Sequence, residues 1–91
     1  MKIVWDEIKR QANIDKHRLD FELLDTEFFE RALIFPAKRG RRQAIGEVEP
    51  GVVVVIFMML GSEGLSVISM RPANKKERDL HAEKAEDFDG V

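Results

Sequence analysis

The sequence VVVVIFMML, residues 52–60, is an uninterrupted apolar run that opens with four valines and an isoleucine. Such β-branched side chains pack well on a pleated sheet and lose freedom in a helix, so the run predicts a strand. No polar residue alternates within it, which favours a central strand covered on both faces. Turn-forming residues flank the run, with Pro50-Gly51 before it and Gly61-Ser62-Glu63-Gly64 after it.

Other stretches are predicted to form strands beside this run: Lys2–Trp5, Ala32–Phe35, Gln43–Val48 and Leu65–Met70. Short connections between the last three stretches and the central run favour an antiparallel meander. The sequence Lys38-Arg39-Gly40-Arg41-Arg42 is expected to form a basic loop within that meander.

The first predicted helix is capped by Asp6 and ends near Lys16, with Ile8 and Ala12 facing Trp5. Its opposite side is expected to be exposed, polar and basic, and to carry Lys9, Arg10 and Lys16.

The second predicted helix is capped by Asp20, and its apolar side chains recur at the helical spacing that favours core packing over a stacking platform. They are Phe21, Leu24 and Phe28, with Leu23 and Phe29 beside them. Asn74 and Glu77 have capping-box spacing, which predicts a last, thinly apolar helix through Leu80 toward Phe88. The end, Asp89-Gly90-Val91, is expected to be frayed.

The predicted order β-α-α-β-β-β-β-α defines an α+β fold with a mostly antiparallel sheet. Two N-terminal helices cover this sheet, and a C-terminal helix follows it. The 91 residues suit a single domain, residues 1–91, with one modest core.

Composition excludes several classes of protein. The absence of cysteine excludes disulfide scaffolds, thiolate metal sites and cysteine nucleophiles. The longest apolar run has nine residues, whereas a membrane-spanning helix needs about 20. The opening Met1-Lys2-Ile3-Val4-Trp5-Asp6 reaches an acid too early for a signal peptide. A cytoplasmic protein is therefore predicted.

The net charge of −2 conceals two basic clusters. All charged residues between Arg31 and Gly46 are basic, and a second cluster contains Arg71, Lys75, Lys76 and Arg78 around Glu77. Such clusters bind phosphates or an acidic partner, or simply form a solvated surface, and composition leaves these alternatives open.

Standard catalytic signatures are missing, and His17 and His81 are the only histidines. Neither has neighbours at metal-ligand spacing, so no metal and no cofactor is predicted. RNA cleavage needs only attack by the substrate's 2′-hydroxyl, proton transfer and neutralisation of phosphoryl charge. Arg42, Arg71 and one histidine are sufficient for that chemistry. From composition alone, however, the favoured interpretation is that Arg71 caps the sheet edge and His17 ends a helix.

Several segments resemble the BrnT toxin family in order and spacing. The opening Trp5-Asp6-Glu7, Lys9, Asn13, Lys16-His17 and Asp20-Phe21 is similar to the start of that family. Ala44-Ile45-Gly46 resembles the A-I-G motif in the middle of the family's sequences, and residues 67–73 followed by Glu77-Arg78 resemble their ending. The match spans about residues 2–78 and leaves residues 79–91 as helix end and tail.

This resemblance implies a RelE-like fold and a ribonuclease toxin that inhibits translation and growth. The implied partner is a ribbon-helix-helix antitoxin like BrnA, which neutralises the toxin and binds promoter DNA to regulate the operon. The hypothesis places Arg42 and Arg71 on the scissile phosphate, with Lys9 and His17 supplying charge or proton transfer. Lys16, Lys38, Arg39 and Arg78 are the expected RNA-binding residues.

Departures from the family pattern motivate an alternative. Arg18 replaces a usual glycine, which is expected to alter that turn, and Ser66 stands where many members have arginine. His81 stands where a tyrosine is common, and is considered as a proton carrier. Met58-Met59-Leu60 replaces polar or basic residues. If this apolar segment is exposed rather than packed in the core, it predicts a catalytically weak binding module that acts mainly through a complex with a DNA-binding partner.

Overall fold

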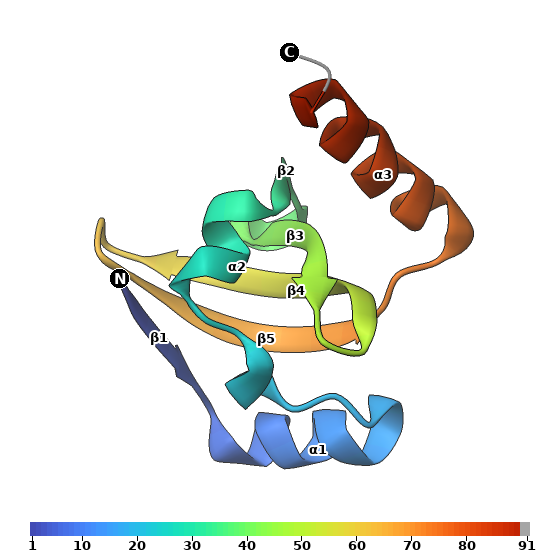
Figure 1. The fold of residues 1–91 in the computed structure, drawn as a ribbon. Helices are drawn as coiled ribbons and strands as arrows, with labels where there is room; N and C mark the ends of the chain where they lie inside the picture. Colours follow the sequence, from blue (N-terminus) through green and yellow to red (C-terminus); the bar gives the residue numbers. More distant parts are fainter. Residues whose placement is uncertain (90–91) are drawn as a thin grey trace.

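The computed structural model describes residues 1–89, with side chains described for residues 1–84, and contains a five-stranded sheet in the order β1-β5-β4-β3-β2 (Figure 1). The strands are β1 (Lys2–Trp5), β2 (Leu33–Pro36), β3 (Arg42–Val48), β4 (Gly51–Leu60) and β5 (Gly64–Pro72). The helices are α1 (Glu7–His17), α2 (Thr26–Arg31) and α3 (Lys75–Asp89), with short 3-10 turns η1 (Phe21–Leu23) and η2 (Lys38–Gly40). Within the described residues, the helices are too short or too polar to cross a membrane.

Strands β2, β3, β4 and β5 form the predicted antiparallel meander, with β4 at its centre. The first strand instead returns beside the last, because β1 pairs in parallel with the beginning of β5, from Lys2 opposite Gly64 to Trp5 opposite Val67. In the described residues no strand pairs with the outer edge of β5 after Val67. Helix α1 lies along that part of β5 (Figure 1).

The main core lies on the face of the sheet that η1 and α2 cover. Phe21, Leu24, Phe28 and Phe29 of the predicted apolar stripe are buried there, which confirms their role in the core. The prediction is wrong for Leu23, which is 43% exposed. Phe29 makes edge-to-face contacts with both Phe28 and Phe57, each at a centroid distance of 5.1 Å, a favourable geometry for aromatic rings. Gly46 permits this packing, because a Cβ there would lie 2.6 Å from Cε2 of Phe28.

The opposite face of the sheet carries a smaller cluster of Ile45, Val54 and Ala73. The expectation that the central run is covered on both faces is therefore correct only for its first half. Val53, Val54 and Val55 are at most 3% exposed, whereas Met58 and Leu60, near the far end of β4, are 36% and 50% exposed.

The second helix was predicted as one continuous element, but the structure divides it. Asp20 caps η1 by accepting from the amide of Glu22, and Leu24 then adopts an extended conformation. Asp25 begins α2 by accepting a hydrogen bond of 2.8 Å from the amide of Phe28. Because aspartate competes for backbone donors, this second cap ends one turn and starts another.

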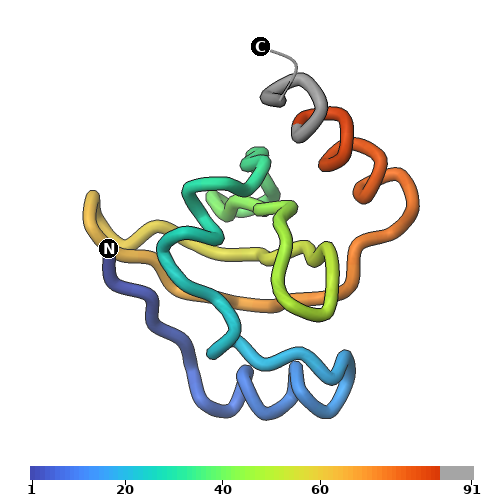
Figure 2. Tube along the Cα trace, viewed as in Figure 1, coloured from blue at the N-terminus to red at the C-terminus, as the bar shows by residue number. Residues whose placement is uncertain are grey.

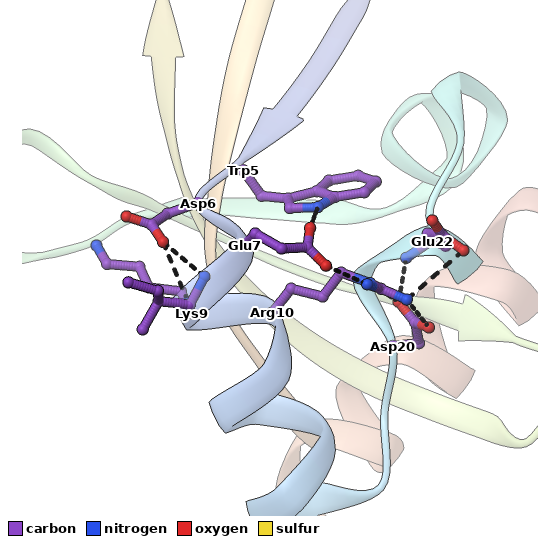
Figure 3. A network of polar contacts seen from close by, with 8 residues as sticks. Trp5, Asp6, Glu7, Lys9, Arg10, Asp20 and Glu22 are labelled. Carbon is purple, nitrogen blue, oxygen red and sulfur yellow. Dashed lines mark hydrogen bonds and ion pairs between the residues drawn. The ribbon is translucent and has the colours of Figure 1, made fainter.

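The orientation of α1 differs from the prediction at three residues. Ile8 is 81% exposed and Ala12 is also exposed, so neither packs in the core. Arg10 points inward instead of lying on the exposed basic side, and its side chain is only 17% exposed. Its guanidinium donates to both carboxylate oxygens of Asp20, at 2.8 and 2.9 Å, and also contacts Glu7 (Figure 3). The pair with Asp20, which caps η1, joins α1 to η1.

The capping box predicted for the last helix is present at the start of α3. The amide of Glu77 donates to Oδ1 of Asn74, and the amide of Asn74 donates to Oε1 of Glu77, both at 2.9 Å. The chain leaves β5 through a short linker and enters α3, which extends away from the sheet (Figure 2). The expected frayed end includes Asp89, which is within α3, while Gly90 and Val91 lie outside the described residues.

The turn after α1 keeps a left-handed conformation although arginine occupies it. Arg18 has φ 59° and ψ 28°, and its amide donates to the carbonyl of Ile14, as in a helix that ends at glycine. A non-glycine residue costs about 1–2 kcal/mol in this conformation.

We therefore expect Arg18→Gly to raise the free energy of unfolding by about 0.5–1 kcal/mol. The measurement is urea unfolding followed by circular dichroism. Lys16→Gly, inside the same helix, is the matched control and should instead lower it by about 1 kcal/mol. Destabilisation by Arg18→Gly would contradict this account of the turn.

Candidate functional site

Arg71, near the end of β5, has a fixed guanidinium. Its Nη1 and Nη2 donate to the two carboxylate oxygens of Glu77, each at 2.8 Å, and Nη1 also donates to the carbonyl of Pro72 at 3.3 Å. The Glu77 side chain is only 13% exposed, whereas that of Arg71 is 42% exposed. The pair joins α3 to the sheet and leaves one side of the guanidinium open to solvent.

The two charges stabilise each other's ionised forms. Hydrogen bonds from Arg71 lower the pKa of the Glu77 carboxyl below its usual range, and partial burial opposes this only in part. The same bonds raise the pKa of Arg71. Both groups are therefore charged at neutral pH, and the pair persists.

A buried amide brings the end of α1 to the same part of β5. The side chain of Asn13 donates to the carbonyl of Leu19 and accepts from the amide of Met70, both at 3.0 Å. Lys16 and His17 are three and four residues after Asn13, so they lie on the same side of the helix. His17 is half-buried and Lys16 is exposed. The structure therefore holds the C-terminal part of α1 beside the later part of β5 (Figure 1).

The basic loop lies toward the other end of the sheet. Lys38 and Arg39 are exposed in η2, and Arg39 has a left-handed φ of 62°. Arg42 begins β3 opposite Phe57 and is exposed. The Nε of Arg41 is buried and has no hydrogen-bond partner within the described residues. This loop is a cationic surface separate from the edge of β5.

The hypothesis that Arg42 and Arg71 hold one phosphate is wrong. Directly opposed residues of antiparallel strands share a face. Arg42 is opposite Phe57 in the main core, whereas Arg71 is opposite Val54 in the smaller cluster, so the two side chains leave opposite faces of the sheet. The residues opposite them on β4, Phe57 and Val54, are also three positions apart, which places Arg42 and Arg71 about 10 Å apart along the strand direction.

Strict alternation of side chains along β5 would place Arg71 on the same face as Val67. A β-bulge explains why it lies on the other face. Ile56 pairs with Ser69 but Phe57 pairs with Val67, so Ile68 is an extra residue in β5. Val67 and Met70 consequently both face the main core, although they are three residues apart. Arg71 is directed to the other face as a result.

The remaining predicted residues are dispersed. Lys9 is exposed in the first turn of α1, eight residues before His17, or about 12 Å along the helix axis. Arg78 is exposed on α3 and donates to the carbonyl of Ala73 at 2.8 Å.

His81 lines a groove between α2, α3 and the turn after β3, together with Glu47, Glu49 and Lys84. Within the described residues, groups of three or more histidine, aspartate or glutamate side chains that could hold a metal ion do not occur.

Two residues that matter to this site were not assigned to it from the sequence. Glu77 was recognised as part of a capping box and of a family motif but not as the partner of Arg71, although its position six residues after that arginine was a signal. Asn13 was noted only for its resemblance to a family motif. No local pattern links Asn13 to Met70, which is 57 residues away.

The fold and its exposed cations define a small α+β protein that presents arginine, lysine and histidine on one sheet and its adjoining helix. Residues 5–77 match a family model described as the ribonuclease toxin BrnT of a type II toxin–antitoxin system. The crystal structure of the Brucella abortus ribonuclease toxin BrnT is 56% identical, with a TM-score of 0.76, and the match covers 99% of that protein and 82% of this one. No curated protein matches.

The chain therefore belongs to the BrnT family of ribonuclease toxins of type II toxin–antitoxin systems, which confirms the resemblance found in the sequence.

The lowered pKa of Glu77 has a defined consequence for stability. A carboxyl with a depressed folded pKa stabilises the fold above its unfolded value, about 4.3 for glutamate, and that contribution is lost as pH falls through the folded value. We expect Arg71→Ala to unfold more easily than the unsubstituted protein at pH 7, with the difference shrinking below about pH 4. Urea unfolding at a series of pH values measures it.

The control for this prediction is Arg31→Ala, because Arg31 pairs with Glu27 on the exposed surface of α2. Exposed pairs contribute little, so its effect should be small at every pH. An effect of Arg71→Ala that is the same at pH 7 and at pH 3 would refute the linkage.

Proposed function

We propose that the chain is an endoribonuclease that cleaves RNA without a metal ion, with its reaction centre at the outer edge of β5. The observation that carries this proposal is the Asn13 amide, which fixes the His17 end of α1 beside the strand of Arg71. The family description supports ribonuclease activity. Inhibition of translation and growth, and a RelE-like relationship of the fold, belong to the same proposal.

In the proposed reaction, His17 accepts the proton of the substrate's 2′-hydroxyl on an imidazole nitrogen. The 2′-oxygen forms a bond to phosphorus, and the bond from phosphorus to the 5′-oxygen breaks. The leaving oxygen takes a proton from water, and the hydroxide left behind takes the proton that His17 had accepted. Arg71 neutralises charge on the non-bridging oxygens, with Lys16 and Arg78 adding positive charge nearby.

The basic loop has a different part in this proposal. Because Arg42 leaves the other face of the sheet, it contacts a flanking phosphate together with Lys38 and Arg39. Lys9, on the first turn of α1, likewise binds RNA outside the reaction centre. These contacts position the strand without specifying its sequence.

The two histidines give a matched test of the reaction centre. We expect His17→Ala to lower the rate of RNA cleavage by purified protein on the order of 100-fold, the usual range for loss of a general base. His81→Ala, in the groove on the other side of α3, should leave the rate within about twofold. Cleavage is followed on a synthetic RNA in buffer containing a chelator.

Comparable rates for His17→Ala and the unsubstituted protein would exclude His17 as the base. Loss of cleavage on chelation alone would exclude the metal-independent mechanism. Thermal unfolding monitored by circular dichroism verifies that each variant is folded.

Exposure of Met58 and Leu60 favours a second function, binding of an antitoxin. Type II toxins have such a partner, and we propose a ribbon-helix-helix protein that binds DNA and represses the shared operon in the complex. In the alternative hypothesis this binding is the main activity and catalysis is weak. Large exposed apolar side chains at the end of β4 suit burial against a partner.

Met58→Ser combined with Leu60→Ser is expected to weaken the complex with the product of the adjacent gene by tenfold or more, because each change removes roughly 1 kcal/mol of apolar burial. Isothermal titration calorimetry measures the affinity. Ile8→Ser is the control, since Ile8 is a more exposed apolar residue on α1. Equal affinities for all three proteins would place the antitoxin elsewhere.

A further inference from the structure

The guanidinium of Arg71 has five N–H donors, and its described contacts account for three of them. Nη1 donates to Glu77 and to the carbonyl of Pro72, and Nη2 donates once to Glu77. The Nε–H and the second Nη2–H have no partner within the described residues. These two bonds are parallel and adjacent, which is the donor arrangement that binds two oxygens of one phosphate.

Glu77 itself is held on its other side. Its Oε1 accepts the amide of Asn74 in the capping box as well as Nη1 of Arg71. Its side chain is 13% exposed, so the carboxylate has little freedom to move away. The first turn of α3 therefore determines the plane of the guanidinium, and with it the direction of the open pair of donors.

We infer that Glu77 is a positioning residue for RNA cleavage, which acts through Arg71 by aiming its Nε–H and free Nη2–H at a phosphate of the substrate. This inference rests on the proposed function of Arg71. It assigns to Glu77 a role distinct from capping α3, and it predicts how substrate binding and turnover change when Glu77 is replaced. The carboxylate repels RNA while it orients the arginine, so binding and turnover respond in opposite directions.

Glu77→Gln tests this role. Glutamine retains an oxygen that accepts the Asn74 amide, but it lacks the charge and the second acceptor that hold the guanidinium in a two-bond pair. We expect kcat to fall on the order of tenfold or more, while KM stays the same or decreases. Asp79→Asn breaks an exposed ion pair with Lys75 on the same helix and should change neither parameter beyond about twofold.

A double-mutant cycle separates positioning from a merely structural role. If Glu77 acts through Arg71, Glu77→Gln should cause no further loss of kcat in an Arg71→Ala protein. If Glu77 only stabilises α3, the same additional loss should appear in both backgrounds, and the inference is overturned. An increase in kcat for Glu77→Gln also overturns it, because Glu77 would then compete with the phosphate.

A binding measurement keeps the inference testable if turnover is slow. The probe is a 2′-O-methyl RNA oligonucleotide, which cannot supply the attacking hydroxyl. The nitrogen-15 spectrum of the full chain should show a shift of the Arg71 Nε–H signal on titration, and Glu77→Gln should reduce that shift at saturation. An Arg71 signal that never responds to the probe overturns the inference.

The outcomes distinguish this inference from the proposed function. An unsubstituted protein that neither cleaves RNA nor binds the probe refutes both. RNA cleavage with unchanged kcat in Arg71→Ala refutes the role of Arg71, and with it that of Glu77, but not the ribonuclease activity. Normal kcat in Glu77→Gln with impaired Arg71→Ala refutes only the role of Glu77.

Discussion

The hydrogen bonds of one buried amide determine how the two halves of this chain fit together. Asn13 satisfies the Met70 amide at the point where β1 no longer pairs with β5, and it also satisfies the carbonyl of Leu19. An unpaired buried amide or carbonyl costs about 1–3 kcal/mol, so the position and rotation of α1 are tightly specified. The location of His17, and hence the proposed reaction centre, depends on this interaction.

Ion pairing divides the arginines into structural and available cations. Arg10 is committed to Glu7 and Asp20 and joins two segments, so it is not a candidate for contact with RNA. Arg71 uses only part of its guanidinium in an ion pair, because the Glu77 carboxylate accepts hydrogen bonds on one side of it. Lys38, Arg39 and Arg42 are exposed on the opposite end of the sheet. The positive surface is therefore smaller and more divided than the count of basic residues implies.

Features encoded by neighbouring residues were predictable from the sequence, and features that depend on distant contacts were not. The valine run predicts β4, and the caps at Asp6 and Asn74 are present because a cap involves only the next three residues. The Asp25 cap was missed because a continuous apolar stripe conceals the break at Leu24. The face of Arg71 depends on a bulge, which shifts all later side chains of β5 and leaves no clear mark in the sequence.

The free edge at β2 has a consequence for self-association. Its Ile34 and Phe35 are 44% and 37% exposed, a composition that invites another copy to add a strand. Pro36 ends the strand without an N–H donor, and the cationic residues 38 and 39 follow after Ala37. A second copy that added a strand here would find a ladder only four residues long, ending at a residue that cannot donate, and so short an edge limits sheet-to-sheet association.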